Sequence, residues 1–412
     1  MLYVGIDWAD DHHDVCLTDD SAKTLAQFQI SHTAEGFNTL HKAIAPHQAD
    51  PQQVAVALET SRGLLVHDLL RQGYQVYAIN PKAVNRYKDR HVLSRAKSDR
   101  VDALSMAHLL RTDRHCFKPL APLPEDYRLL DRLCADLRKI IDDKVRVSNQ
   151  LTAVLKEYYP QALGLFASFD SRIALAFLAA FADPHSLRAL KKSRFIAFFK
   201  RQRYTHPERV ESMWRQAQVP APEADPVVVR AGRLRLLALV DQLQALRRHQ
   251  AQYEQEIQAI LDQLPESKIL PTLPGVNKRL APELAAALGP NQPDQPKRFE
   301  SAQELSALAG CVPITRASGK WQSVTVRRAC VKSLRRTFYN WAQASLLTSQ
   351  WARAYYDYRK AQQHRHSTIL RGLGSKWAKI LYALWANGEV YNETRHIQQL
   401  RNHKVVWAMT LS

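Results

Sequence analysis

The first 120 residues constrain the fold most, because short apolar runs alternate there with turn-forming residues in a definite order. Residues 3–7, 13–19 and 24–30 have the pattern of three consecutive strands, which predicts an antiparallel meander at the start of the chain. The patterns of a helix, a strand, a helix, a strand and a last amphipathic helix follow over residues 34–47, 54–59, 63–73, 74–80 and 95–113. We therefore expect an α/β domain over residues 1–120.

Four acidic residues fall at marked positions in this order. Asp7 ends the first expected strand and Glu59 ends the fourth, whereas Asp99 and Asp102 lie three apart on one face of the last helix. The order of elements is that of the ribonuclease H-like (RuvC-like) fold, in which strands one and four lie side by side at the centre of the sheet. All four carboxylates could then meet. Hard oxygen ligands of this kind suit Mg²⁺, with Mn²⁺ as the other candidate.

Simpler roles exist for each acid. Asp7 could cap a strand, Glu59 could pair with Arg62, and nearby cations could offset the charges of the helical pair. The opening GID segment also occurs in actin-like ATPases. Those enzymes need further glycine-rich phosphate loops, and the chain has only 13 glycines. The four positions taken together favour the metal site.

The composition indicates a polyanionic partner. There are 58 Lys and Arg residues against 39 Asp and Glu residues, a formal net charge of +19, so nucleic acid is the leading candidate. No apolar run approaches the roughly 20 residues that span a bilayer, and the N-terminus has no signal-peptide pattern. Five scattered cysteines indicate reduced thiols. We expect a cytoplasmic protein without a membrane partner.

A proline-rich break at residues 119–126 predicts three regions: an N-terminal domain at 1–120, a helical middle at 121–265 and a C-terminal domain at 266–412. Within the middle, residues 130–154 and 231–264 carry apolar side chains at heptad spacing. Two helices packed within one chain and a coiled coil between chains explain this spacing equally well. Lys144 and Gln250 interrupt the two apolar seams.

Cations surround four aromatic residues between these helices: Phe195, Phe198, Phe199 and Tyr204. Interleaved basic and aromatic residues suit nucleic acid. The simpler interpretation, which we prefer, places the aromatic rings in a core and the cations on its solvated face.

The C-terminal region is expected to be mainly helical. Residues 270–290 resemble a helix-hairpin-helix element, and Ser301 and Glu304 form a capping-box start for a helix that ends at Gly310. The predicted loop after it carries Ser318. The following helix is expected to be two-faced, with Cys330, Leu334, Phe338 and Trp341 on its apolar side. The cations expected to bind nucleic acid are Arg316 and Lys320 in the loop and Arg327, Arg328, Lys332, Arg335 and Arg336 on or beside the helix.

These residues lie in segments that resemble the DEDD transposases of bacterial insertion sequences, specifically the insertion-sequence one-ten family of bridge-RNA-guided recombinases. The segments are GIDWADDHHDV, ALETSRG, KSDRVDA, LPGVNKRLAPELAAALG and an FxSAxxLxALAGxVPxxxxSG pattern, and the resemblance covers nearly the whole chain. One departure follows the serine, where VTVRRACVKSL stands in place of the family's ISKxG-like turn. Ser323 is therefore an alternative to Ser318.

The resemblance implies a mechanism. Asp7, Glu59, Asp99 and Asp102 would hold magnesium, and Ser318 would attack DNA to form a covalent phosphoserine link. It also implies a homo-oligomer, a tetramer built as a dimer of dimers, in which the serine of one protomer completes the acid site of another. A noncoding guide RNA would pair with donor and target double-stranded DNA.

The leading expectation is a transposase that cuts and rejoins the DNA of its own insertion sequence, associated with the bacterial nucleoid. One alternative is a metal-dependent junction-resolving nuclease that uses the acids to activate water and does not need Ser318. A third possibility is a protein that only bridges DNA.

Overall fold

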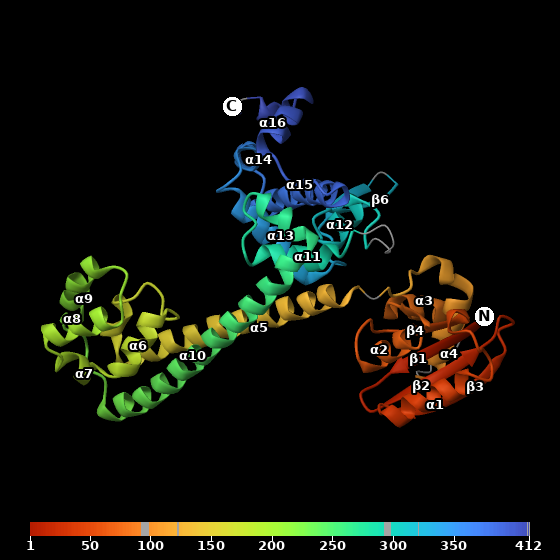
Figure 1. Ribbon diagram of the computed structural model, residues 1–412, viewed down its shortest axis with the longest axis horizontal. Coiled ribbons are helices and arrows are strands. Elements are labelled where there is room, and N and C mark those ends of the chain that lie inside the picture. Colours follow the sequence, from red (N-terminus) through yellow and green to blue (C-terminus); the bar gives the residue numbers. More distant parts are fainter. Residues whose placement is uncertain (92–98, 122, 292–297, 320, 410, 412) are drawn as a thin grey trace. The chain divides into compact units, whose positions relative to one another are not determined.

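The computed structural model describes residues 1–91, 99–121, 123–291, 298–319, 321–409 and 411 (Figure 1). The chain divides into two compact units, Met1–Pro122 and Leu123–Ser412. No helix in the described part of the chain is long and apolar enough to cross a membrane.

A five-stranded mixed sheet forms the centre of the first unit. Its order is β3-β2-β1-β4-β5, in which the first three strands along the chain pair antiparallel, whereas β1 with β4 and β4 with β5 pair parallel. The strands span Leu2–Trp8 (β1), His12–Thr18 (β2), Thr24–Ser31 (β3), Val54–Leu58 (β4) and Gln75–Ala78 (β5). The expected meander and the pairing of strands one and four are confirmed. The topology is compatible with a ribonuclease H-like domain.

Helices cover both faces of this sheet. They span Ala34–Ile44 (α1), Leu64–Arg71 (α2), Pro81–His91 (α3) and Asp99–Asp113 (α4). Even-numbered β1 residues such as Val4 share a core with α1 and α2, whereas odd-numbered ones such as Tyr3 share a core with α3 and α4. The elements expected from the sequence did not include α3. The expected helix over 95–113 begins at Asp99, and residues 92–98 lie outside the described residues.

The second unit contains two long helices that pack along one another within the chain (Figure 1). They are α5 (Glu125–Tyr158) and α10 (Pro226–Gln263). Lys144 and Gln250, which interrupt the apolar seams, face each other, and Lys144 Nζ donates a hydrogen bond to Gln250 Oε1 at 2.9 Å. The intrachain alternative is therefore the one that the structure shows. Assembly between chains stays a prediction.

Four short helices close one end of this pair: α6 (Arg172–Ala180), α7 (Pro184–Arg188), α8 (Lys192–Arg201) and α9 (Val210–Ala217). They share a core with the C-terminal half of α5 and the N-terminal half of α10. Phe195, Phe198 and Phe199 are all buried in it, and Tyr204 packs against it. The interpretation of these aromatic residues as core residues is therefore confirmed.

The other end of the pair belongs to a mainly helical body with its own core. This body contains α11 (Leu280–Leu288), α12 (Ala302–Leu308), β6 (Ile314–Ser318), β7 (Trp321–Thr325), α13 (Lys332–Ser345), α14 (Gln350–Ala361), α15 (His366–Asn387) and α16 (Glu393–Asn402). Short 3-10 helices span Pro51–Gln53, Arg114–Cys116, Pro160–Gly164, Pro207–Arg209, Pro265–Lys268, Leu270–Thr272 and Val406–Ala408.

Three local expectations for this body need correction or refinement. The expected loop around Ser318 is a β-hairpin of β6 and β7. The following helix begins at Lys332, so Arg328 and Cys330 precede it and do not lie on its faces. In the segment expected to be a helix-hairpin-helix, a 3-10 helix precedes the turn, and α11 follows it and ends at Leu288, just before Gly289.

A buried carboxyl group ties α5 to the segment after α10. Tyr127 Oη donates a hydrogen bond to Glu266 Oε2 at 2.8 Å, and Glu266 is only 2% exposed. Burial raises the pKa of the Glu266 carboxyl above its ordinary value. The folded protein therefore keeps this proton at pH values where the unfolded chain has released it.

We predict that Glu266→Gln removes a pH-dependent part of the stability. In the wild type, the contribution of Glu266 to the free energy of unfolding falls as pH rises from about 4.3, the ordinary Glu pKa, through the raised pKa of the folded state. Guanidinium unfolding of both proteins between pH 4.5 and 8 measures the difference. The variant should gain stability relative to wild type as pH rises; parallel curves would mean that the carboxyl is ionised in the folded protein.

Candidate active site

Asp7 and Glu59 lie at the ends of neighbouring parallel strands. Gly5 of β1 is in register with Ala57 of β4, and Glu59 directly follows Leu58, the last residue of that strand. Because side chains alternate along a strand, Asp7 belongs to the row of Tyr3 and Gly5 that faces α4, and Glu59 comes one residue after the end of the neighbouring strand. Asp7 is half-buried and Glu59 is exposed. The two acids thus mark one edge of the sheet.

Helix α4 brings a further carboxylate toward the same edge. Gly5 lies against the backbone of Ala103, whereas Tyr3, nearer the start of β1, shares a core cluster with Leu110. The N-terminal part of α4, which carries Asp102, therefore lies toward the end of β1 that carries Asp7. Asp99 is the first residue of α4, and its side chain lies outside the described part of the structure.

Asp102 has a cationic partner. Lys88 of α3 forms an ion pair with the Asp102 carboxylate, and the two side chains are 20% and 18% exposed. A half-buried carboxylate is costly without a counter-charge, and the ammonium group supplies it. Within the described ranges, no three His, Cys, Asp or Glu side chains are gathered closely enough to hold a metal ion. The donor set of carboxylate oxygens nevertheless has the chemistry that magnesium prefers.

A fifth carboxylate was missed by the sequence analysis. Asp14 of β2 is in register with Asp7 across the antiparallel pair, so both side chains lie on the same face. Asp14 is 7% exposed and accepts a hydrogen bond from Gln29 Nε2 at 3.4 Å. The sequence held part of the signal: two consecutive expected strands predicted the antiparallel pair, but the register that places Asp14 opposite Asp7 depends on the turn between them.

The candidate nucleophile lies in the second unit. Ser318 is the last residue of β6, exposed, in register with Trp321, and followed by Gly319 with a φ of +58°. The alternative, Ser323, lies within β7 opposite Arg316 and is half-buried. Of the two serines, Ser318 is the one at the turn of the hairpin.

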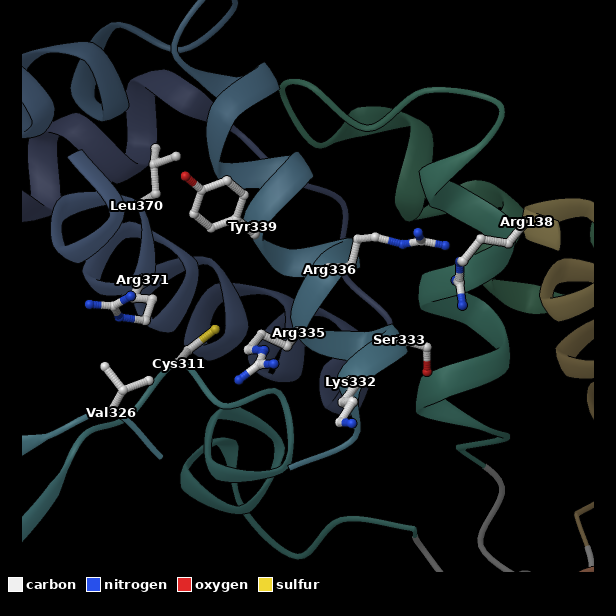
Figure 2. A pocket seen from close by; sticks show the side chains of 10 residues that line it. All are labelled: Arg138, Cys311, Val326, Lys332, Ser333, Arg335, Arg336, Tyr339, Leu370 and Arg371. Atoms are coloured by element: carbon white, nitrogen blue, oxygen red, sulfur yellow. The ribbon is translucent and has the colours of Figure 1, made fainter. Parts of the chain in front are cut away.

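Most of the expected nucleic-acid-binding cations are placed by the structure. Arg316 is exposed on β6, Arg327 and Arg328 precede α13, and Lys320 lies outside the described residues. Lys332, Arg335 and Arg336 of α13 line a cavity of about 610 Å³ (Figure 2). The sequence missed two further cations of this cavity, Arg138 of α5 and Arg371 of α15. Only tertiary packing brings them to α13.

Comparisons with known proteins agree over both units. A transposase model of the IS110 DEDD type matches residues 4–160, which include Asp7, Glu59, Asp99 and Asp102. A model described as the transposase IS116/IS110/IS902 family matches residues 267–357, which include Ser318.

Relatives match over most of their length. The chain is 33% identical over 404 residues to the mini-circle putative transposase for IS117 of Streptomyces coelicolor, with 96% of each chain covered. It is 24% identical over 409 residues to the uncharacterized 42 kDa protein of insertion element IS900 from Mycobacterium paratuberculosis, covering 95% of this chain and 97% of that one. The chain therefore belongs to the IS110 family of transposases, enzymes that cut and rejoin DNA.

Proposed function

We propose that this transposase cuts and rejoins the DNA of its own insertion sequence through a covalent phosphoserine intermediate at Ser318. The observation that carries the proposal is the position of this residue. It is exposed at the end of β6, beside a glycine turn, in the region matched by the second transposase model. A hydroxyl at an exposed turn is accessible to a phosphodiester that a buried strand residue could not reach.

The chemistry conserves the energy of the DNA ester. Ser318 Oγ attacks a backbone phosphorus, an Oγ–P bond forms, and one P–O bond of the DNA breaks. The serine proton ends on the leaving oxygen, which becomes a hydroxyl group. A second DNA hydroxyl then attacks the phosphoserine, which rejoins the strand and restores the serine. No external energy source is needed.

The acids are proposed to hold the divalent ion, Mg²⁺ or Mn²⁺. Asp7, Glu59, Asp99 and Asp102 supply the oxygen ligands, and Asp14 adds negative charge to the same face. When bound, the ion neutralises phosphate charge and stabilises the attacking and leaving oxygens. Lys88 now neutralises Asp102 and would give up this pairing when the ion binds.

The partners follow from the charge and from the family. The net charge of +19 supports binding to double-stranded donor and target DNA and to a noncoding guide RNA. We also propose an assembly of several copies, a dimer of dimers, in the cytoplasm beside the nucleoid. The ribonuclease H-like fold of the first unit is part of the same proposal.

A junction-resolving nuclease remains the second candidate, favoured by the position of Asp7 and Glu59 at the ends of neighbouring strands, with Asp102 on the helix that packs against β1. Such an enzyme would use the acids to activate water and would leave no protein on the DNA.

We predict that Ser318→Ala abolishes covalent attachment to DNA. The protein would be incubated with Mg²⁺, labelled element-junction DNA and RNA transcribed from the noncoding flank of the element, and then separated on a denaturing gel. Wild type and Ser323→Ala should give a slow-migrating protein–DNA adduct, and Ser318→Ala should give none. Cleaved DNA without an adduct, unchanged in Ser318→Ala, would favour the nuclease. An adduct lost only in Ser323→Ala would move the nucleophile to Ser323.

We predict that Asp102→Asn slows adduct formation at least about 100-fold, because ion-held stabilisation of the transition state is worth several kcal/mol. Asp113→Asn, at the other end of the same helix, is the matched control and should keep its rate. Adding EDTA to the wild-type protein should slow adduct formation as much as Asp102→Asn does. Excess Mg²⁺ or Mn²⁺ should restore the rate. Equal rates for both variants, with circular dichroism showing both folded, would exclude Asp102 from the reaction.

A further inference from the structure

Two adjoining cavities lie beside the base of the β6–β7 hairpin. Their volumes are about 610 and 440 Å³, within the range of about 300–1,000 Å³ usual for ligand sites. Both are lined by Cys311, Val326 and Arg371, so they share a wall. Val326 directly follows β7. The cavities thus adjoin one another at the foot of the strand pair.

Both cavities are lined by several cations. The first is lined by Arg138, Lys332, Arg335, Arg336 and Arg371, and the second adds Arg327, Arg359 and Arg365. Among the lining residues that the structure describes, there is no Asp or Glu. We call these eight cations and the space between them the cationic groove.

Few of these charges are compensated within the protein. Arg138 pairs with Glu283 at 2.8 Å and Arg336 with Asp142 at 3.3 Å. For the other six, the described ranges contain no carboxylate within 4.0 Å, and Arg327 Nε is buried without a hydrogen-bond partner there. Four of these six, Arg327, Arg335, Arg359 and Arg371, are half-buried, whereas Lys332 and Arg365 are exposed. A half-buried cation without a counter-charge is costly, and a bound anion would offset that cost.

The groove is built by packing and is not only a surface patch. A Cβ at Gly310 would lie 3.2 Å from Arg335 Cδ, so the glycine leaves room for the stem of this arginine. Glu283, which holds Arg138, also accepts a hydrogen bond from Thr337 Oγ1 of α13. Figure 2 shows the Arg336 and Arg138 side chains extending toward one another from α13 and α5. Carboxylates therefore hold the guanidinium groups of Arg138 and Arg336, and packing at Gly310 positions the stem of Arg335.

We infer that the cationic groove binds consecutive backbone phosphates of one nucleic-acid strand and leads that strand to the serine hairpin. This inference rests on the proposed function, because it takes the transposase's own nucleic acid as the partner. Seven of the eight cations are arginines, whose planar guanidinium groups match phosphate oxygens bidentately. Two adjoining cavities suit a chain of phosphates better than a single small anion.

The phosphates in the groove are not the ones that react. Four residue steps separate Ile314 at the base of β6 from Ser318 at its end, about 14 Å at 3.4 Å per residue. The groove therefore holds flanking backbone, and its loss should weaken binding without removing the chemistry at saturating protein.

The salt dependence of binding tests the groove. Fluorescence anisotropy of the full chain in EDTA would use labelled single-stranded DNA, duplex DNA and single-stranded RNA at several salt concentrations. Arg335→Gln/Arg371→Gln should reduce the slope of log K against log salt by about 1.4 on single strands and about 1.8 on duplex. Lys332→Gln, at an exposed side chain that does not support the core, should reduce it by about half as much. The control, Arg230→Gln/Arg248→Gln, removes two exposed α10 cations and should change it less.

The outcomes are separable from those of the serine reaction. A slope that falls more in the groove variants than in the control supports the inference, and the nucleic acid on which it falls identifies the strand as DNA or RNA. A slope unchanged in Lys332→Gln and in the folded double variant, or reduced equally in the control, overturns it. Ser318→Ala should bind with the wild-type slope, so a failed adduct experiment leaves this result intact.

Discussion

The approach of α4 to the backbone of β1 at Gly5 is the contact on which the candidate acid site depends. A Cβ at this position would lie 1.9 Å from the carbonyl oxygen of Ala103 and 2.6 Å from the backbone nitrogen of Ala107. Helix and strand therefore meet backbone to backbone, and both alanines are fully buried. A larger side chain at any of these positions would push α4 off the sheet and carry Asp102 away from the strand ends. Small residues without chemistry of their own set the site's geometry.

Each of the two charged regions requires a partner of opposite sign. The acids of the first unit lie on one face, where Lys88 neutralises Asp102 and a divalent cation would neutralise more. The groove of the second unit has the reverse imbalance, with cations and no lining carboxylate among the described residues. Nucleic acid together with a divalent ion satisfies both. Under the proposed function, the ion would offset the carboxylates of the first unit, and the phosphates would offset the arginines of the second.

Local patterns in the sequence predicted much of this architecture. Alternation along residues 3–7 and 54–59 predicted two buried strands, and the element order placed Asp7 beside Glu59. Heptad spacing predicted α5 and α10 but not their partners, because a seam within one chain and a seam between chains have the same periodicity. The structure shows the seam within the chain, where Lys144 donates a hydrogen bond to Gln250 across the pair and also forms an ion pair with Asp170. Helix α3 had a signal that was overlooked: Asn80 accepts a hydrogen bond from the Lys82 N–H, and Pro81 follows the cap.

The remaining features depend on contacts far apart in sequence, which no local pattern encodes. The charge periodicity of α13 continues back to Arg328, yet the helix begins at Lys332 because Val331 is extended and its N–H donates to the Leu308 carbonyl at 3.0 Å. The β6–β7 hairpin is exposed on both faces, so it lacks the alternation of apolar and polar residues that reveals a half-buried strand. Arg138 and Arg371 enter the groove only through the packing of α5 and α15 around α13. A nucleic-acid site assembled in this way can be recognised in sequence by its excess of charge, but its members emerge only when the helices are packed.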